Sequence, residues 1–406
     1  MLVKEQVSKE RRLIAGVSIA SIVVYINLYL VQGMLPLIAE HFLVSMSQAT
    51  LLLSITSFTL AIFLLFFALL SDRIGRKKPA LVSLYLIALI DFMMIWTHDF
   101  SVLLLLRMIQ GGLLAALPAV AMAYFKDELG QDLLLKAGAI YITVNSLGGI
   151  LGRLLGGIMS EYLTWSQSMH FLFVLTLIGC FISSYYLPDC RFNKPVREQS
   201  KGYVSQADIA GFVLHLRDLK MRLVYCIGGL AFMVMVNQFS YIQLHLMASP
   251  FSWNRFEVTF IFLCYLSGTF ATYRSGKWLR RLGFSRVVLF CVGLMCFGVL
   301  LTLLNSPFNI FLGFLLSALG FFLLHTSCNT WVAMRANAHR SKATALYLCC
   351  YYIGAALGGP YLLPFWQRWE WSGVVLGVVI VLFITLLLVA KYISLPEPQK
   401  VKLPLF

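Results

Sequence analysis

Charged residues are scarce in this chain. Asp, Glu, Lys and Arg together form 12% of its 406 residues, against about 25% in an ordinary soluble domain, and only 17 of them are acidic. So few charges exclude a water-soluble globule. Polar low-complexity tracts are also absent, which excludes a disordered chain.

The usual marks of catalysis and of disulfide or metal frameworks are missing too. The nine cysteines form no Cys-x-x-Cys pair and sit almost entirely inside apolar runs, which excludes a disulfide-stapled secreted module. The chain also has no Gly-x-Ser-x-Gly, no Gly-x-x-x-x-Gly-Lys and no His-Glu-x-x-His motif. We therefore expect no enzyme, no ATP-driven pump, no cofactor and no metal site.

Long apolar runs dominate instead, since 60% of the residues are hydrophobic. A bilayer core takes roughly 20 apolar residues per helical crossing. Runs of this length lie near 13–37, 47–70, 79–97, 100–125, 137–160, 169–187, 221–247, 256–279, 284–305, 308–334, 343–366 and 371–394. The sequence thus predicts an all-α membrane protein with twelve transmembrane helices. The first run is about 25 residues long, too long for a signal-peptide core, so we expect it to remain in the mature protein.

One longer polar connection, rich in charge, divides the twelve runs into two sets of six. We expect an N-terminal six-helix bundle over 1–187, a cytoplasmic linker over 188–220, and a C-terminal six-helix bundle over 221–406 that ends in a short cytoplasmic tail. The linker includes Cys190, which we expect to be the one cysteine in a loop.

The basic residues predict the orientation of the chain. If the N-terminus is cytoplasmic, 28 of the 32 Lys and Arg residues fall in cytoplasmic segments, as expected for a bacterial inner-membrane protein. Only Arg255 and Arg368 fall in outer loops, while Arg107 and Arg153 lie within helices. The net charge of +15 is therefore a sign of membrane topology and not of nucleic-acid binding.

The two halves resemble each other in sequence. Between the second and third helices of each half, DRIG at 72–75 aligns with RRLG at 280–283, an offset of 208. A second pair of similar segments is Gly148-x-x-x-Gly152 and Gly354-x-x-x-Gly358. Repeated six-helix bundles are the architecture of alternating-access carriers, whose substrate site lies at the repeat interface near mid-membrane.

These features resemble the major facilitator superfamily over nearly the whole chain. Residues 70–78, LSDRIGRKK, are similar to its cytoplasmic signature, and the resemblance implies conformational gating by Asp72, Arg73, Gly75 and Arg76. Residues 103–111, LLLLRMIQG, are similar to a motif of proton-coupled members that contains Arg107.

Residues 145–157, NSLGGILGRLLGG, are similar to the glycine-rich antiporter signature. Spaced glycines let helices approach closely, and we expect this role for Gly148, Gly152 and Gly156 and for Gly354 and Gly358. Arg153 stands where that signature has proline. This departure favours a narrower branch, the YnfM-type bacterial inner-membrane transporters, which also resemble the segments around His325, Tyr351 and Trp366.

Three charges remain inside the apolar spans: Asp91, Arg107 and Arg153. Counted along the predicted helices, they share a depth in the outer half of the membrane. Intramembrane charges are costly and usually face a cavity or a partner. We expect Asp91 to pair with Arg107 and the two arginines to form one positive patch that carries substrate or proton coupling, although a purely structural pair is an open alternative.

Polar side chains in helices one, four, seven and ten are the candidates for lining a cavity, because the resemblance implies that these helices surround it. The candidates there are Tyr25, Asn27, Gln32, Gln110, Asn237, Gln238, Tyr241 and Asn329, together with Tyr351 in helix eleven. His325 is a further candidate for coupling, since the unperturbed pKa of histidine lies near neutrality. Each of these residues alternatively bridges helices.

The sequence therefore predicts a secondary active transporter without enzymatic activity. We expect proton-coupled efflux of a small amphipathic or aromatic compound by alternating access. Import of a small polar or anionic solute with protons is the alternative, and a non-transporting membrane sensor on a transporter scaffold is a third reading. The expected partners are the small-molecule substrate, protons and the lipid bilayer, and we expect a monomer that binds no nucleic acid.

Overall fold

The computed structural model describes residues 2–189, 206–336 and 340–395, and within these ranges the chain forms helices and their connections without any strand. Cys190 and the rest of the predicted linker up to residue 205 lie outside the described residues. The described part of that linker contains a helix, α10 (Gln206–Arg217).

The helices of the first half follow the predicted runs closely. They are α1 (Leu2–Gly33), α2 (Leu35–His41), α3 (Met46–Ala49), α4 (Leu51–Ile74), α5 (Lys77–Met94), α6 (Phe100–Leu114), α7 (Ala116–Glu128), α8 (Gln131–Tyr162) and α9 (Trp165–Tyr186). The run predicted at 100–125 divides into α6 and α7. Pro118 explains the division, because it has no N–H to donate to the carbonyl four residues earlier.

The helices of the second half are α11 (Leu219–Met247), η1 (Glu257–Leu266), α12 (Ser267–Leu282), α13 (Phe284–Leu301), η2 (Thr302–Leu304), α14 (Pro307–Arg335) and α15 (Arg340–Ser394). α15 consists of two membrane-crossing helices joined at Trp369 and Glu370, whose backbone is not helical. In the described chain, nine helical segments are long and apolar enough to cross a membrane, and α15 counts among them once. With α5, the η1–α12 pair and the two parts of α15, the predicted twelve crossings are confirmed.

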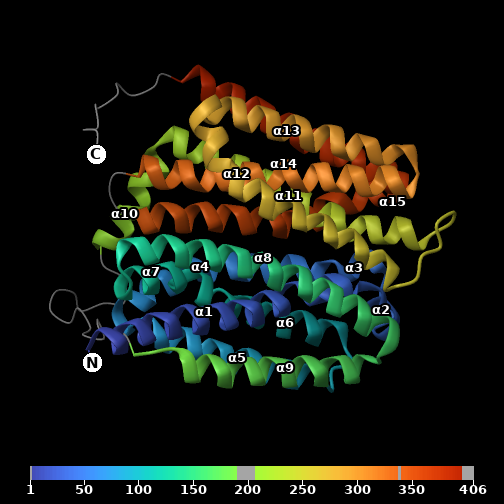
Figure 1. The fold of residues 1–406 in the computed structure, drawn as a ribbon. Coiled ribbons are helices and arrows are strands. Elements are labelled where there is room, and N and C mark those ends of the chain that lie inside the picture. Colours follow the sequence, from blue (N-terminus) through green and yellow to red (C-terminus); the bar gives the residue numbers. More distant parts are fainter. Residues whose placement is uncertain (1, 190–205, 337–339, 396–406) are drawn as a thin grey trace.

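The two halves lie side by side as two layers of long helices. In Figure 1 the first half, blue to green, forms the lower layer and the second half, yellow to red, forms the upper layer. Where the layers meet, α8 packs on η1, and α4 packs on the first part of α15.

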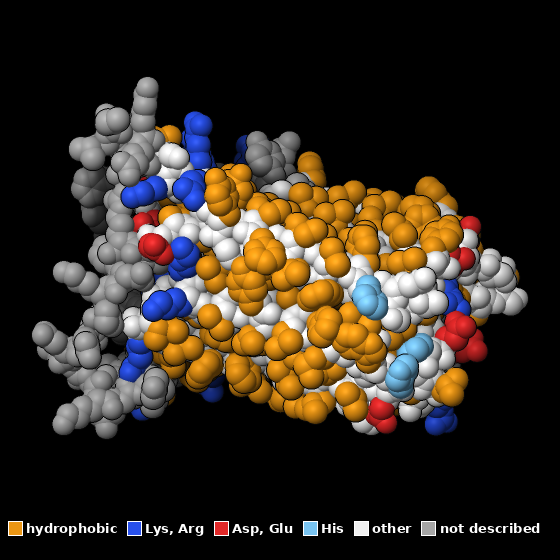
Figure 2. Space-filling model, turned by 90° about the horizontal axis from the view of Figure 1, so that it is seen from below, with side chains coloured by type: hydrophobic (Ala, Val, Ile, Leu, Met, Phe, Trp, Pro, Cys, Tyr) orange, Lys and Arg blue, Asp and Glu red, His pale blue; other side chains and the backbone are white. Residues whose placement is uncertain are grey.

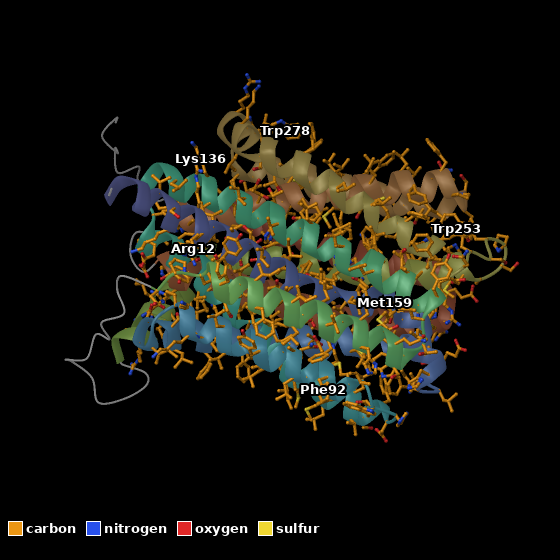
Figure 3. All side chains as sticks on the ribbon, turned by 60° about the horizontal axis from the view of Figure 1, so that its bottom comes forward. Arg12, Phe92, Lys136, Met159, Trp253 and Trp278 are labelled. Carbon is orange, nitrogen blue, oxygen red and sulfur yellow. The ribbon has the colours of Figure 1, made fainter. Side chains whose placement is uncertain are left out.

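The exposed surface along the helices is apolar. Figure 2 shows hydrophobic side chains over the middle of one face, with Lys and Arg gathered mainly toward one end. We call the end that carries the N-terminus, Gly75 and Leu187 the terminal end, and the opposite end, with His98 and Arg255, the far end. In Figure 3, Arg12 and Lys136 lie toward the terminal end and Met159 and Trp253 toward the far end, while Phe92 points outward from the bundle.

Glycines pack equivalent helices together in both halves. A Cβ on Gly152 would meet the backbone of Ile26 in α1 at 2.8 Å, and one on Gly156 would meet that of Leu30 at 2.2 Å. In the second half, a Cβ on Gly354 would meet the backbone of Gly229 in α11 at 1.9 Å. α8 therefore approaches α1 as closely as α15 approaches α11, which is the packing expected of spaced glycines.

Candidate functional site

A fully buried polar network lies inside the N-terminal bundle, where α1, α5, α6 and α9 meet. Its members are Asn27, Asp91, Arg107, Gln110 and Thr176, and none is more than 1% exposed. Polar groups buried among apolar helices are stable only when they bond to one another. The network supplies these bonds from four different helices.

Asp91 is held by neutral groups. The Thr176 hydroxyl donates to its Oδ2 at 2.7 Å, and the Gln110 amide nitrogen donates to its Oδ1 at 2.7 Å. Asn27 closes the ring, because it donates to the Thr176 hydroxyl at 2.9 Å and accepts from Gln110 at 3.2 Å. The carboxylate is thus connected to three other helices without an ion pair to any described residue.

Arg107 sits on the other side of Gln110. Its Nη1 donates to the Gln110 side-chain oxygen and, at 3.0 Å, to the Asn27 carbonyl, while its Nη2 donates to the Leu28 carbonyl at 3.3 Å. The direct Asp91–Arg107 ion pair predicted from their shared depth was therefore wrong. Gln110 is long enough to bond both groups. Its amide lies between the Asp91 carboxylate and the Arg107 guanidinium, so these two charges do not contact each other directly.

Arg153 lies elsewhere, at the interface between the two bundles. It projects from α8, and its Nε donates to Gln32 Oε1 in α1 at 2.8 Å. Its guanidinium carbon stands 3.8 Å from the centre of the Tyr29 ring and 4.4 Å from that of Tyr265 in η1. The arginine thus contacts both halves of the molecule. Such cation–π contacts are strongest when desolvated, and Arg153 is 2% exposed.

Gln32 extends this contact into the C-terminal bundle. Its amide nitrogen donates to the Val236 carbonyl and to the Ser240 hydroxyl of α11, both at 2.8 Å. Gln243 of the same helix donates back to the Gln32 carbonyl at 3.1 Å. Arg153, Gln32 and α11 therefore form one connected interface.

The predicted single patch of Arg107 and Arg153 was wrong as well. Asn27 points toward α6 and α9, whereas Tyr29 and Gln32 point toward α8, η1 and α11, so the two arginines lie on opposite sides of α1. They do share a depth, because both contact α1 within residues 27–32. Asn27 and Gln110, predicted to line a cavity, lie inside the N-terminal bundle instead.

Aromatic side chains form the interface next to Arg153. Tyr25 and Tyr29 of α1 stack with ring centres 6.3 Å apart, and in α15 the ring centres of Tyr351 and Tyr352 lie 5.2 Å apart. On the opposite side, Tyr351 stacks on Phe232 with ring centres 3.6 Å apart. We call Tyr25, Tyr29, Tyr265, Tyr351 and Tyr352 the tyrosine wall.

His325 adjoins this wall. It hydrogen-bonds with the Tyr347 hydroxyl through Nδ1 at 3.0 Å, and its ring centre lies 4.6 Å from that of Tyr351. Asn329, one turn further along α14, is partly exposed and has a buried Oδ1 without a partner among the described residues. Both side chains therefore remain candidates at the interface.

The polar side chains of α11 mostly hold helices together. Asn237 donates to the carbonyls of Met233 and Ala355, Gln238 donates to the Ser317 hydroxyl at 2.8 Å, and Tyr241 donates to the Gly359 carbonyl at 2.9 Å. These partners belong to the C-terminal bundle. For these three residues the structure favours helix bridging over cavity lining.

The expected gating motif forms the turn between α4 and α5. Arg76 makes an ion pair with Asp72 at 2.5 Å and another with Asp127, at the end of α7, at 3.1 Å. Burial opposes the charge of Arg76, yet the two carboxylates together raise its pKa above the ordinary value. Gly75 ends α4 with a φ of 88°, a conformation that disfavours other residues. Arg73 lies in the last turn of α4.

At the far end, contacts of Arg255 tie the two bundles together. Arg255 pairs with Glu40 and donates to the Ser160 carbonyl at 3.2 Å, and its backbone N–H donates to Glu161 at 3.1 Å. The tie borders an open groove between α2, α3 and α11. Sequence showed Arg255 only as one of two outer-loop arginines.

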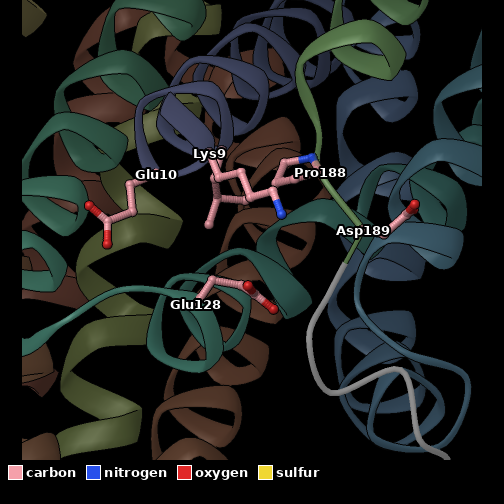
Figure 4. A pocket seen from close by; sticks show the side chains of 6 residues that line it. Lys9, Glu10, Glu128, Pro188 and Asp189 are labelled. Atoms are coloured by element: carbon pink, nitrogen blue, oxygen red, sulfur yellow. The ribbon is translucent and has the colours of Figure 1, made fainter. Parts of the chain in front are cut away.

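A small pocket at the terminal end has a different position. It is lined by Lys9, Glu10, Leu13, Glu128, Pro188 and Asp189 (Figure 4). Four of these residues belong to the N-terminal bundle and two, Pro188 and Asp189, to the start of the linker, so no residue of the C-terminal bundle lines this pocket. We give it no role in transport.

Comparisons with known proteins agree with this architecture. The sequence profile of the Major Facilitator Superfamily matches residues 17–358 and, in a second match, 224–405. The chain is 32% identical to the uncharacterized MFS-type transporter YybF of Bacillus subtilis over 92% of each chain. It is 31% identical to the inner membrane transport protein YnfM of Escherichia coli over 91% of this chain and 87% of that protein.

A shorter similarity, 30% identity over 38% of each chain, relates it to the chloramphenicol resistance protein CraA of Acinetobacter baumannii. Among solved structures, a mutant of the nucleoside transporter NupG superposes with a TM-score of 0.74, covering 94% of this chain and 99% of that one at 14% identity. The human organic anion transporter MFSD10 superposes with a TM-score of 0.70 at 16% identity, which shows a shared fold.

Proposed function

Because the chain belongs to the Major Facilitator Superfamily, we propose that it is a proton-coupled antiporter that exports a small amphipathic or aromatic compound by alternating access. The single observation that carries this proposal is the tyrosine wall between the bundles. Substrate sites in such carriers lie at the interface of the repeats, and aromatic faces bind flat apolar compounds by stacking. The similarity to a protein named for chloramphenicol resistance supports the direction.

Asp91 is the proton carrier in this proposal. It is the carboxylate buried in the N-terminal bundle, and intramembrane carboxylates mark proton relays in transporters. Gln110 connects it to Arg107, and Asn27 connects the same network to α1, whose other face carries Tyr29. In this proposal, a change in the protonation of Asp91 alters its hydrogen bonds, and α1 transmits that alteration to the interface between the bundles.

We further propose that the terminal end faces the cytoplasm of a bacterium and that the protein lies in the inner membrane. The basic residues concentrate toward that end, as the positive-inside rule requires. In this orientation, the Arg255–Glu40 ion pair ties the two bundles together on the outer side.

Inside-out vesicles test the proposal. With an imposed interior-acid gradient, addition of chloramphenicol should release protons from the vesicle, measured as recovery of acridine orange fluorescence. Asp91→Asn should abolish this recovery. Asp99→Asn is the matched control, because Asp99 only caps α6 at an exposed loop and asparagine caps equally well.

Two results would contradict the proposal. Normal proton release by Asp91→Asn would remove the assigned carrier. Accumulation of the probe in right-side-out vesicles under an inward proton gradient would support the importer reading instead.

A further inference from the structure

Arg153 is a buried cation that forms no ion pair within the described part of the chain. Among the described residues, no carboxylate lies within ion-pair distance of it. Its Nε and Nη1 bond to Gln32 and to the Gly149 carbonyl, both at 2.8 Å, and both acceptors are uncharged. A desolvated guanidinium is costly unless its donors are used. The positive charge of Arg153 is therefore not neutralised by these two acceptors at the bundle interface.

A buried hydroxyl lies beside Arg153. The Tyr265 side chain is 6% exposed, and its buried hydroxyl has no partner within the described chain. The Tyr265 ring centre is 4.4 Å from the Arg153 guanidinium carbon, so the two side chains form one site. Buried hydroxyls nearly always have partners, and an exception calls for an explanation.

We propose that Arg153 and Tyr265 together bind a carboxylate of the transported compound, so that the substrate is an aromatic acid. This inference rests on the proposed function and adds a charge to its substrate class. Both groups offer N–H or O–H donors, which suit an oxyanion acceptor. A cationic compound would be repelled by the positive charge of Arg153.

The surroundings fit the rest of such a molecule. The ring centres of Tyr29 and Phe262 lie 3.8 and 5.3 Å from the guanidinium carbon. Ring contacts lead from Tyr265 through Phe322 and Phe321 to Tyr351. A carboxylate held by Arg153 leaves an attached aromatic ring next to these side chains.

The site also joins the two halves of the molecule. Arg153 comes from α8 of the N-terminal bundle and Tyr265 from η1 of the C-terminal bundle. A carboxylate bound by both residues holds the bundles together, and rearrangement of the bundles separates its two donors. Substrate binding and alternating access are thereby coupled at this place.

Paired probes test the charge requirement. The purified full-length protein is titrated with salicylate, indole-3-acetate and 1-naphthoate and, in parallel, with salicylamide, indole-3-acetamide and 1-naphthamide, and binding is measured as the rise in melting temperature in detergent. At least one acid should bind, and should bind at least tenfold more tightly than its amide. Wild-type protein that binds no acid more tightly than the matching amide would overturn the inference.

Variants assign the binding to these two side chains. Arg153→Gln should weaken acid binding about 30-fold or more, the loss typical when one partner of a buried charged contact is removed. Tyr265→Phe should weaken it about tenfold. Because the Tyr265 hydroxyl has no partner within the described chain, this variant keeps the ring and should fold as well as wild type. Arg368→Gln, which removes an arginine at the far end, is the control and should bind like wild type. Unchanged acid binding in both Arg153→Gln and Tyr265→Phe would refute the site.

Transport separates this inference from the proposed function. Proton-linked release by chloramphenicol in vesicles, without any preference for acids in the binding assay, would keep the exporter and reject the carboxylate site. Acid binding that depends on Arg153 and Tyr265, without proton-linked flux of any probe, would keep the site and reject the proposed antiporter.

Discussion

Gly75 and Gly283, 208 positions apart, end equivalent helices of the two halves with the same backbone conformation. Gly75 follows α4 with φ 88° and ψ 171°, and Gly283 follows α12 with φ 77° and ψ 162°. The offset is the one at which the two loops align in sequence. The internal repeat is thus present in the backbone dihedral angles as well as in the residue types.

The positive φ predicts a cost for any side chain at Gly283. A Cβ there would meet nothing within 4 Å, so the strain is that of the backbone alone. Gly283→Ala should lower the free energy of unfolding by about 1–2 kcal/mol. Gly293→Ala is the matched control, because Gly293 has equal space inside α13 and no positive φ, and it should be neutral or stabilising by up to about 1 kcal/mol. Melting temperatures in detergent measure both, and equal shifts would contradict the argument.

The twelve crossings were predictable from sequence because a bilayer imposes a length and an apolar composition on each helix. The turn between α4 and α5 was predictable too, since its charges and glycine stand at fixed spacing. The bundle that each face of α1 contacts was not predictable. Asn27 and Tyr29 differ by about 200° around a helix, but periodicity alone does not say which bundle each side meets.

The candidate site was only partly accessible to sequence reasoning for the same reason. Equal depth suggested that Arg107 and Arg153 act together, whereas contacts place α1 between them. Tyr265 was missed altogether, because a tyrosine within an apolar run gives no signal of a hydroxyl without a partner. Only three-dimensional contacts reveal that property.

Gln110 provides a test of the buried network. Gln110→Met keeps the side-chain length but removes the bonds to Asp91 and Arg107, leaving two charged groups undersatisfied. We expect a loss of about 2 kcal/mol or more in stability and loss of proton-linked flux. Gln48→Met, in an exposed capping box at the far end, should cost under about 1 kcal/mol and leave flux intact. Wild-type coupling in Gln110→Met would show that the network is structural only.

Asp72 should affect the rate of conformational exchange and not substrate affinity. It lies at the terminal end and is 56% exposed, away from the tyrosine wall. In Asp72→Asn, Arg76 keeps its bonds to Asp127 and Ser71, so stability should change by less than about 1 kcal/mol. Flux should fall several-fold while the affinity in detergent stays within about twofold. Asp189→Asn, an exposed partner of Lys77, is the control and should transport normally. A large loss of affinity with normal turnover would be the opposite result.

Cysteine labelling in intact cells tests the orientation. In a variant free of the nine native cysteines, His98→Cys places a thiol at the exposed far end, and Asp189→Cys places one at the exposed terminal end. Membrane-impermeant maleimide should label only His98→Cys, and a permeant maleimide should label both. Labelling of Asp189→Cys from outside would reverse the proposed topology.

The Arg255–Glu40 ion pair should hold the far end closed. Arg255 joins the loop before η1 to α2 and α8, so its removal takes away contacts that exist only while the bundles touch there. Ser240, buried against Gln32 beneath this tie, reports the opening. In a background that carries Ser240→Cys and lacks the native cysteines, Arg255→Ala should raise the rate of labelling by an impermeant maleimide about three- to tenfold. The reason is that a half-exposed ion pair and its neighbouring hydrogen bond contribute on the order of 1 kcal/mol to the closed state.

A charge exchange is the control. The double variant Glu40→Arg with Arg255→Glu should return the labelling rate toward the slower value of the parent, whereas either single variant should accelerate labelling. If Arg255→Ala labels no faster than its parent, closure of the far end rests on the Arg153, Gln32 and α11 contacts instead.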